Sequence, residues 1–244
     1  MADHNVRFEH ENSMDPEFSR LVDFAADVAA SGRWEAANKR IEHLAESPGK
    51  DNEWWVQVIA SLCSQVFSEY LLLKRAYEET KNDNAALLAW RARNLLELSV
   101  WSISCSKSRA NARRLYEDAG RDAFGLFGAF TRWGIATAQD PEWLDPITGA
   151  KQDLSKRAAA EGINSLDGPY KQVREAAEEC GLGENLTLSH KMLSKFAHPT
   201  AMQILAPLDE AKVSKQKDFF FSQGCLFFTG AFEALEGQLL QECA

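Results

Sequence analysis

The sequence lacks the motifs that identify most enzyme classes. It contains no Glu-x-x-His pair and no His-Glu-x-x-His helix, which argues against a di-iron bundle and a zinc hydrolase. A Gly-rich phosphate loop and a Gly-x-Ser-x-Gly elbow are also absent, which argues against a P-loop nucleotidase and an α/β-hydrolase. No pattern indicates a metal or a cofactor, so we expect neither.

The chain also lacks the features of secreted and membrane proteins. Its five cysteines are scattered and form no Cys-x-x-Cys pair, which is typical of cytosolic thiols. The first 13 residues contain no basic segment followed by an apolar one, so no secretory signal is predicted. The longest apolar run, Phe219 to Phe232, is shorter than the roughly 20 residues of a spanning helix. We expect a cytoplasmic protein that does not cross a membrane.

Strand-like alternation is missing, and apolar residues recur at spacings of three and four, so the fold class predicted is all-α. The hydrophobic content of 45% supports a sizeable core, and a net charge of -9 disfavours nonspecific binding to nucleic acid. We expect residues 1–14 to be disordered and residues 15–244 to form a single helical domain. Pro16 and Gly32 bound the first predicted helix. The Pro- and Gly-containing residues 139–150 predict a loop, followed by a small helical insertion in the bundle. The other predicted helices cover residues 34–45, 53–80, 85–106, 109–138, 154–162, 169–180, 188–197 and 211–242.

The helix predicted over 85–106 is apolar around most of its circumference, which is typical of a central helix. Arg93 and Glu97 lie on one stripe of it, with Trp90 and Trp101 at either side. Buried charges require partners, so we expect this pair to contact each other or a polar segment elsewhere. Two interpretations stay open: an internal pair that fixes helix register, and a polar cleft that binds a ligand.

The segment Ser194 to Thr200 supplies the best candidate partner, His198. Pro199 disfavours helical geometry at the residue before it, so His198 is predicted at a helix C-terminus, where the helix dipole favours its charged form. His190, two turns earlier, is the weaker candidate. Lys195 and Thr200 are predicted to assist in substrate binding.

The helix predicted over 109–138 begins with several cations. Its spacing predicts the ion pairs Arg113–Glu117, Arg114–Asp118 and Glu117–Arg121 on an exposed face, with a phosphate-binding patch as the alternative. Asp122 is predicted to face Arg93 as a substrate-binding residue. In the Phe-rich C-terminal helix, Gly224 and Gly230 predict close packing in the core, and a homodimer seam is the alternative.

The Arg93-x-x-x-Glu97 helix, the Leu115-Tyr116 helix and the Ser194-x-x-x-His198-Pro-Thr200 segment resemble an uncharacterised, all-helical family of bacterial proteins. More distantly, this pattern resembles the HEPN (higher eukaryotes and prokaryotes nucleotide-binding) domains, many of which are ribonucleases in toxin and antiphage systems. Their signature places an arginine four to six residues before a histidine on one helix, whereas here Arg93 would supply the cation from a different helix.

The sequence therefore leads to two hypotheses. In the first, His198, Arg93 and Glu97 form the catalytic centre of a site that binds or cleaves a nucleotide or RNA phosphate in stress or phage defence, with His198 as general acid or base. Its predicted substrate-binding residues are Lys195, Thr200, Asp122, Trp90 and Trp101. In the second, the cluster is purely structural and the protein is a non-enzymatic interaction or regulatory module.

Overall fold

The computed structural model describes residues 16–46, 50–79, 85–198, 200 and 210–243. All regular secondary structure among them is helical, which confirms the all-α prediction. The segment 1–14, predicted to be disordered, lies outside the described residues, as do Asp15 and Pro199. The helices are α1 (Pro16–Ala30), α2 (Arg33–Glu46), α3 (Lys50–Glu79), α4 (Ala85–Lys107), α5 (Arg109–Ala136), α6 (Pro141–Ala160), α7 (Val173–Glu179), α8 (Gly183–Ala197) and α10 (Glu210–Glu242).

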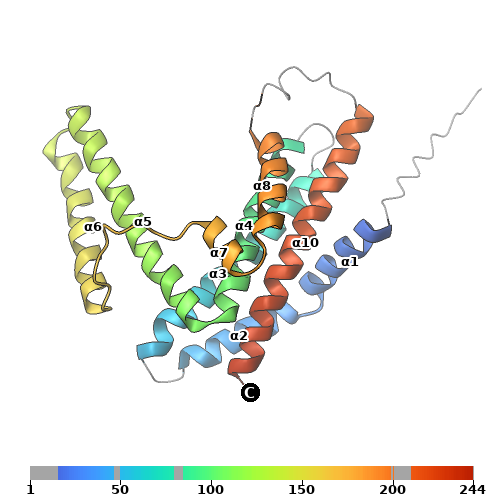
Figure 1. The fold of residues 1–244 in the computed structure, drawn as a ribbon, viewed down its shortest axis with the longest axis horizontal. Coiled ribbons are helices and arrows are strands. Elements are labelled where there is room, and N and C mark those ends of the chain that lie inside the picture. Colours follow the sequence, from blue (N-terminus) through green and yellow to red (C-terminus); the bar gives the residue numbers. More distant parts are fainter. Residues whose placement is uncertain (1–15, 47–49, 80–84, 199, 201–209, 244) are drawn as a thin grey trace, which may run out of the picture.

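Helix α4 is the centre of the bundle, as its even distribution of apolar residues predicted. It contacts α3, α5, α7, α8 and α10, and α1 and α2 pack at the side formed by α3 and α10 (Figure 1). Leu88, Ala92 and Leu95 of α4 are fully buried. Its buried Ala and Ser residues keep the helix narrow, so that α10 lies closely along it.

The Phe-rich helix α10 is a core helix. Phe228 stacks on Tyr70 of α3 with ring centroids 4.1 Å apart, and Phe221 stacks on Tyr77 at the same separation. At Gly224 an added Cβ would overlap the side chain of Leu73, so this glycine permits the close approach of α10 to α3. The core interpretation is thus confirmed for the helix and for close packing at Gly224. At Gly230 the predicted close packing is wrong, because an added Cβ there would meet nothing within 4 Å. A homodimer through the same helix stays a prediction.

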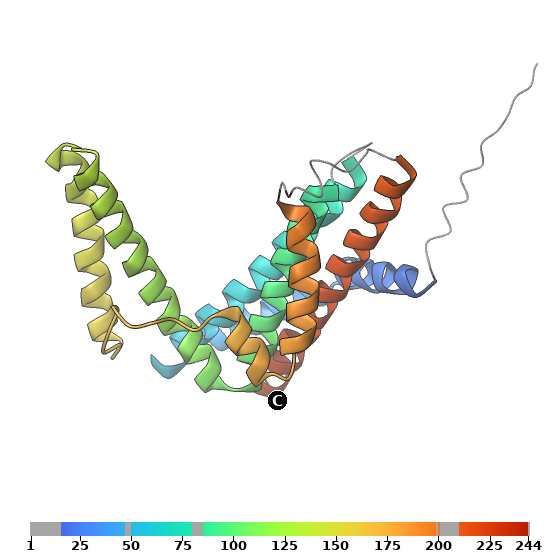
Figure 2. The same ribbon diagram turned by 45° about the horizontal axis from the view of Figure 1, so that its top comes forward.

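Helices α5 and α6 form an arm that diverges from the bundle and gives the molecule the outline of a V (Figures 1 and 2). Near the tip of this arm, the rings of Trp133 and Trp143 meet edge to face at 5.3 Å. Gly134 brings the two helices together, because an added Cβ there would lie 2.6 Å from the Trp143 ring.

The prediction of a loop over residues 139–150 is wrong, because α6 starts at Pro141 and continues through Pro146. Pro141 occupies the first turn, where its missing N–H costs nothing. Pro146 removes one internal hydrogen bond, and the packing of Trp143 and Leu144 against Gly134 offsets that loss. The region predicted as a small helical insertion therefore contains α6, which forms a helical hairpin with α5, and the short helix α7 after it.

One stretch in the described part of the chain, Glu53–Glu79 of α3, has the length and apolar composition of a membrane-spanning helix. The same stretch supplies Trp55, Ile59 and Tyr70 to the bundle core, where each is at most 1% exposed. The packing of the bundle accounts for part of its apolar composition, since 39% of the apolar window is buried.

Candidate functional site

Arg93 of α4 lies at the centre of a cluster with two histidines of α8. Its Nε donates to Glu97 Oε1 at 3.2 Å and lies 3.1 Å from His190 Nε2. Its Nη1 lies 3.0 Å from His198 Nε2. The predicted meeting of Arg93, Glu97 and the His198 segment is therefore found, and His190, which we ranked lower, belongs to the same cluster.

The contacts determine which ring nitrogens carry protons. A guanidinium only donates hydrogen bonds, so Nε2 of both histidines must accept from Arg93, and each neutral ring then carries its proton on Nδ1. Nδ1 of His190 accordingly lies 3.4 Å from Ser194 Oγ, which can accept that proton's hydrogen bond. His190 Nε2 is also 3.4 Å from Glu97 Oε1, so a protonated His190 would exchange its contact with Arg93 for an ion pair with Glu97.

The cluster is half-buried, whereas the sequence led us to expect Arg93 and Glu97 in the interior. Their side chains are 25% and 34% exposed, and His198 is exposed. The reason is the shape of the molecule. Helix α5 leaves the bundle in the region of α4 that contains Glu97, so solvent enters between the arm and the bundle. These side chains can therefore be reached from outside.

Two of the predicted substrate-binding residues adjoin this cluster. Trp101 and Asp122 line a cleft of about 440 Å³ between α4, α5 and the segment before α7, and Glu97 lines it as well. Tyr170 and Lys171 complete its far side. The cleft thus extends the Arg93 cluster toward the base of the V.

The other three predicted residues lie differently. The ring of Trp90 packs against the guanidinium of Arg91 at 4.5 Å and has no described contact with Arg93. Lys195 is exposed, and its carbonyl oxygen accepts a hydrogen bond from the Thr200 hydroxyl at 3.2 Å. The Thr200 hydroxyl thus binds a carbonyl in the last turn of α8. His198, the residue that follows the helix, adopts an extended conformation, as predicted for the residue before Pro199.

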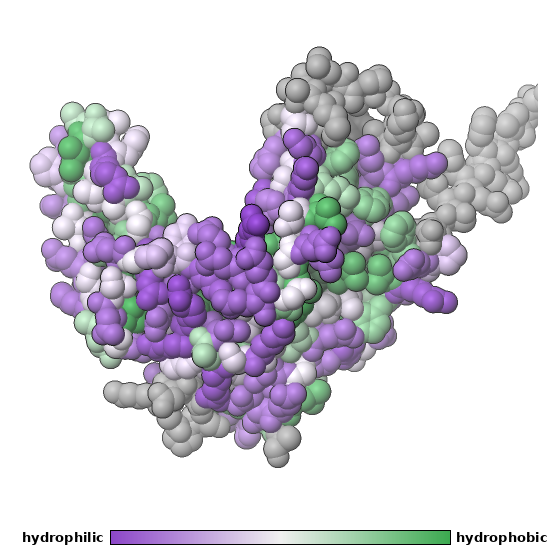
Figure 3. Space-filling view, in the orientation of Figure 1, coloured by the Kyte–Doolittle hydropathy of each residue, from purple (hydrophilic) through white to green (hydrophobic). Residues whose placement is uncertain are grey.

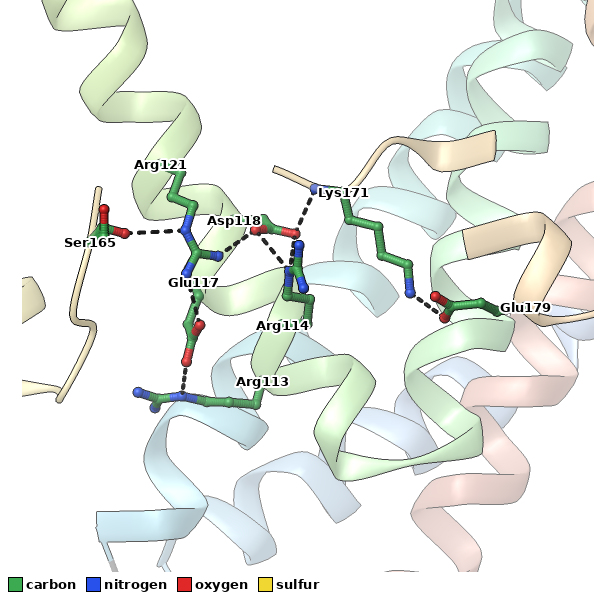
Figure 4. A network of polar contacts seen from close by, with 8 residues as sticks. All are labelled: Arg113, Arg114, Glu117, Asp118, Arg121, Ser165, Lys171 and Glu179. Atoms are coloured by element: carbon green, nitrogen blue, oxygen red, sulfur yellow. Dashed lines mark hydrogen bonds and ion pairs between the residues drawn. The ribbon is translucent and has the colours of Figure 1, made fainter. Parts of the chain in front are cut away.

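A second polar network surrounds Asp118 (Figure 4), and the burial of its central carboxylate was not predicted from the sequence. The three predicted ion pairs of α5 form, yet Asp118 is only 4% exposed. Its carboxylate accepts from Arg121 Nη1 at 2.6 Å, from Arg114 Nε at 3.2 Å and from the backbone N–H of Lys171 at 3.0 Å. The face of α5 that was expected to be exposed is therefore partly buried, because the segment before α7 covers it.

The cations at the end of α4 and the start of α5 all have protein partners, which leaves little support for a phosphate-binding patch there. Lys107 donates to the Cys180 carbonyl at 3.0 Å, and Arg109 pairs with Glu242 at 2.7 Å. Arg113 donates to the Glu161 carbonyl at 2.5 Å as well as to Glu117.

The sequence analysis also missed the ion pair between Arg91 of α4 and Glu69 of α3. The two side chains are 19% and 13% exposed, less than Arg93 and Glu97, and their closest atoms are 3.1 Å apart. Asn94 donates to the same carboxylate at 3.2 Å. The available signal was the presence of Arg91 on a helix with few charges, which requires an acidic partner on a neighbouring helix.

Among the described residues, no group of three or more His, Cys, Asp and Glu side chains is arranged to hold a metal ion. Comparisons with known proteins found no matching family model, no matching curated protein and no matching solved structure.

Proposed function

We propose that the cluster of Arg93, His190 and His198 binds a phosphate group of RNA or a nucleotide and cleaves RNA phosphodiester bonds. One observation carries this proposal: a single solvent-accessible guanidinium contacts Nε2 of two histidines. Within the described part of the chain, Nη2 of Arg93 has no hydrogen-bond partner. It therefore has donors left for a phosphate, which guanidinium groups bind well.

The residues present can perform the necessary proton transfers. The 2′-oxygen of RNA attacks phosphorus as a neutral imidazole removes its proton, and the bond to the 5′-oxygen breaks as a protonated imidazole donates to it. Arg93 stabilises the additional negative charge on the phosphorane. Glu97 lies 3.4 Å from His190 Nε2 and would stabilise that ring after it has gained a proton. In this scheme the ligand displaces the two contacts of Arg93 with the rings: His190 Nε2 then has a free lone pair and acts as the base, and His198, in its protonated form, acts as the acid.

The cleft beside the cluster supports a ligand larger than phosphate. Trp101 offers an aromatic surface, and the carboxylate of Asp122 can accept hydrogen bonds from a base or sugar. The proposal agrees with the resemblance to HEPN domains, and a role in stress or phage defence belongs to the same proposal.

The experiment compares His198→Ala and Arg93→Lys with the wild-type protein in RNA cleavage and thermal unfolding. We expect both variants to lose cleavage by about a hundredfold or more, because general acid–base catalysis contributes about that much and lysine lacks the planar guanidinium. Both should keep a melting temperature within a few degrees of wild type, since the side chains are part-exposed. Arg75→Ala, which breaks an exposed ion pair on α3, is the matched control and should retain full activity.

A non-enzymatic interaction module is the second candidate, and one observation favours it. Glu97 offsets the charge of Arg93, and together with the histidines the pair joins α4 to α8, as a purely structural cluster would. This candidate predicts that wild-type protein neither cleaves RNA nor binds nucleotides, and that the Arg93 and His198 variants lose stability. That combined result would overturn the nuclease proposal.

A further inference from the structure

A cavity of about 450 Å³ lies between α4, α8 and α10. Each of these helices lines it over two turns, with residues from 96–103 of α4, 182–189 of α8 and 223–230 of α10. Two turns of helix are roughly 10 Å long, so the cavity extends about that far along the bundle. It shares no described lining residue with the cleft beside the Arg93 cluster, and it is therefore a separate site.

The cavity follows from the way α8 and α10 pack. Both lie closely on α4 and only loosely on one another, and they run antiparallel (Figures 1 and 2). The rings of Phe196 and Phe220 join them, with centroids 5.0 Å apart. About two turns from this contact lie Ser189 and Phe227, which line the cavity. Farther along α10, an added Cβ at Gly230 would meet nothing within 4 Å, so small residues leave a space that the ring contact bounds at one end.

The lining of the cavity is mostly apolar, and none of the described residues that form it is charged. Leu188 and Leu226 belong to it although they are 62% and 41% exposed. Figure 3 shows hydrophobic surface along α10 on this side of the molecule. A molecule bound here would remove these leucines from water, and it would have to be uncharged, because an ion would find no partner of opposite charge.

Three uncharged polar side chains also line the cavity: Asn185 and Ser189 of α8 and Gln223 of α10. In the part of the chain that the structure describes, their side chains form no hydrogen bond, whereas Ser99 of α4 donates to the Leu96 carbonyl at 2.7 Å. A few convergent polar groups in an apolar pocket orient a bound ligand. Amides and hydroxyls both donate and accept, so these three suit a ligand that carries a hydroxyl, carbonyl or amide group.

The size of the cavity limits what it can hold. An apolar cavity of about 150 Å³ binds benzene, so one of about three times that volume takes a molecule larger than a single ring. Helices that dock in grooves extend over at least two turns, and here the Phe196–Phe220 contact blocks continuation at one end. A compact small molecule therefore fits better than a partner helix.

We propose that this cavity binds one uncharged, mostly apolar small molecule roughly 10 Å long, whose single hydrogen-bonding group is held by the amides of Asn185 and Gln223. This inference does not depend on the proposed nuclease activity.

Fluorescence titration of the full chain with prodan tests the proposal, because this naphthalene dye is uncharged, carries one ketone and shifts its emission to the blue in apolar surroundings. We expect saturable binding of one dye per chain. Octanol should displace the dye, and octanoate, which has the same chain length and a negative charge, should need a concentration at least about tenfold higher.

Gly230→Leu fills the cavity from α10 and should weaken prodan binding at least about tenfold. Gly237→Leu is the matched control, because Gly237 lies two turns later on the same helix, has equally open space for a Cβ and does not line the cavity. Both variants should melt no lower than the wild type, since leucine favours the helix over glycine.

The double variant Asn185→Leu with Gln223→Leu removes both amides and should weaken octanol binding at least about fivefold. Any of four results would overturn the proposal: no saturable dye binding or one dye per two chains, equal displacement by octanol and octanoate, Gly230→Leu binding the dye as Gly237→Leu does, or unchanged octanol affinity in the double variant.

Discussion

Asp118 shows how one buried carboxylate can join distant parts of a chain. It lies on α5, yet it accepts a hydrogen bond from the backbone of Lys171, more than fifty residues later. Arg121 of the same network also donates to the Ser165 carbonyl at 3.2 Å. The segment that returns from the arm to the bundle is therefore attached to α5 at several points (Figure 4).

Replacing Asp118 with alanine should lower the free energy of unfolding by about 3 kcal/mol or more, because it leaves the guanidinium of Arg121 without its closest partner in a mostly buried place. Asp153→Ala is the control, since its ion pair with Lys156 is exposed at both ends and should contribute under about 1 kcal/mol. Urea denaturation of both variants measures the difference. Equal losses would show that the network is not a structural centre.

The sequence predicted the ion pairs of α5 but not which of them is interior. Spacing along a helix determines that Arg114 and Asp118 are neighbours, and this prediction is confirmed. Burial of Asp118 depends on the segment that contains Lys171, whose path no local pattern predicts. Likewise, the sequence led us to His198, whereas the entry of His190 into the cluster depends on how α8 rotates against α4.

At the scale of helices, periodicity and end signals predicted the bounds of α1 to α5 and of α10 to within about three residues, whereas the starts of α7 and α8 were four and five residues off and proline misled at α6. Pro16 starts α1, and Gly32, with a φ of 74°, follows its end. Pro146 was interpreted as part of a loop because proline is unfavourable inside a helix. The contact of Trp143 with Gly134 and Trp133, which favours the helix, joins two helices and cannot be inferred from either one alone.

The two glycines of α10 give a matched pair of substitutions. Gly224→Ala should destabilise the protein by about 1–3 kcal/mol, because the new methyl group overlaps Leu73 and the core must shift. Gly230→Ala should stabilise it by up to about 1 kcal/mol, because its Cβ meets nothing within 4 Å and alanine favours the helix. Chemical denaturation compares the two. A stabilising Gly224→Ala would mean that α10 and α3 are less closely packed than described.

At the scale of the whole molecule, three buried thiols should make the free energy of unfolding fall at alkaline pH. Burial raises the pKa of Cys63, Cys105 and Cys225 to about 12. Burial likewise raises the pKa of Tyr70 and Tyr77. The five groups come from α3, α4 and α10, so the whole core resists ionisation.

Because the folded pKa of each thiol is above its unfolded value, the unfolded chain loses these protons first as the pH rises. The thiols therefore contribute their full stability below pH ~9, and above it the free energy of unfolding should fall by up to about 1.4 kcal/mol per pH unit for each thiol. Urea midpoints at pH 8 and pH 10 measure the slope. Cys243→Ala, at an exposed position, should leave it unchanged. A stability that stays constant up to pH 10 would contradict the prediction.

The pairing of early and late helices has a consequence during synthesis. Arg33 of α2 binds Glu236 of α10, and the apolar surface of α4 is covered mainly by α10, which begins about a hundred residues after α4 ends. At about 5–20 residues per second, a ribosome needs roughly 5–20 seconds to make that stretch. During this interval the side of α4 that α10 will cover has no native partner, so the nascent chain is most vulnerable to aggregation before α10 emerges from the ribosome.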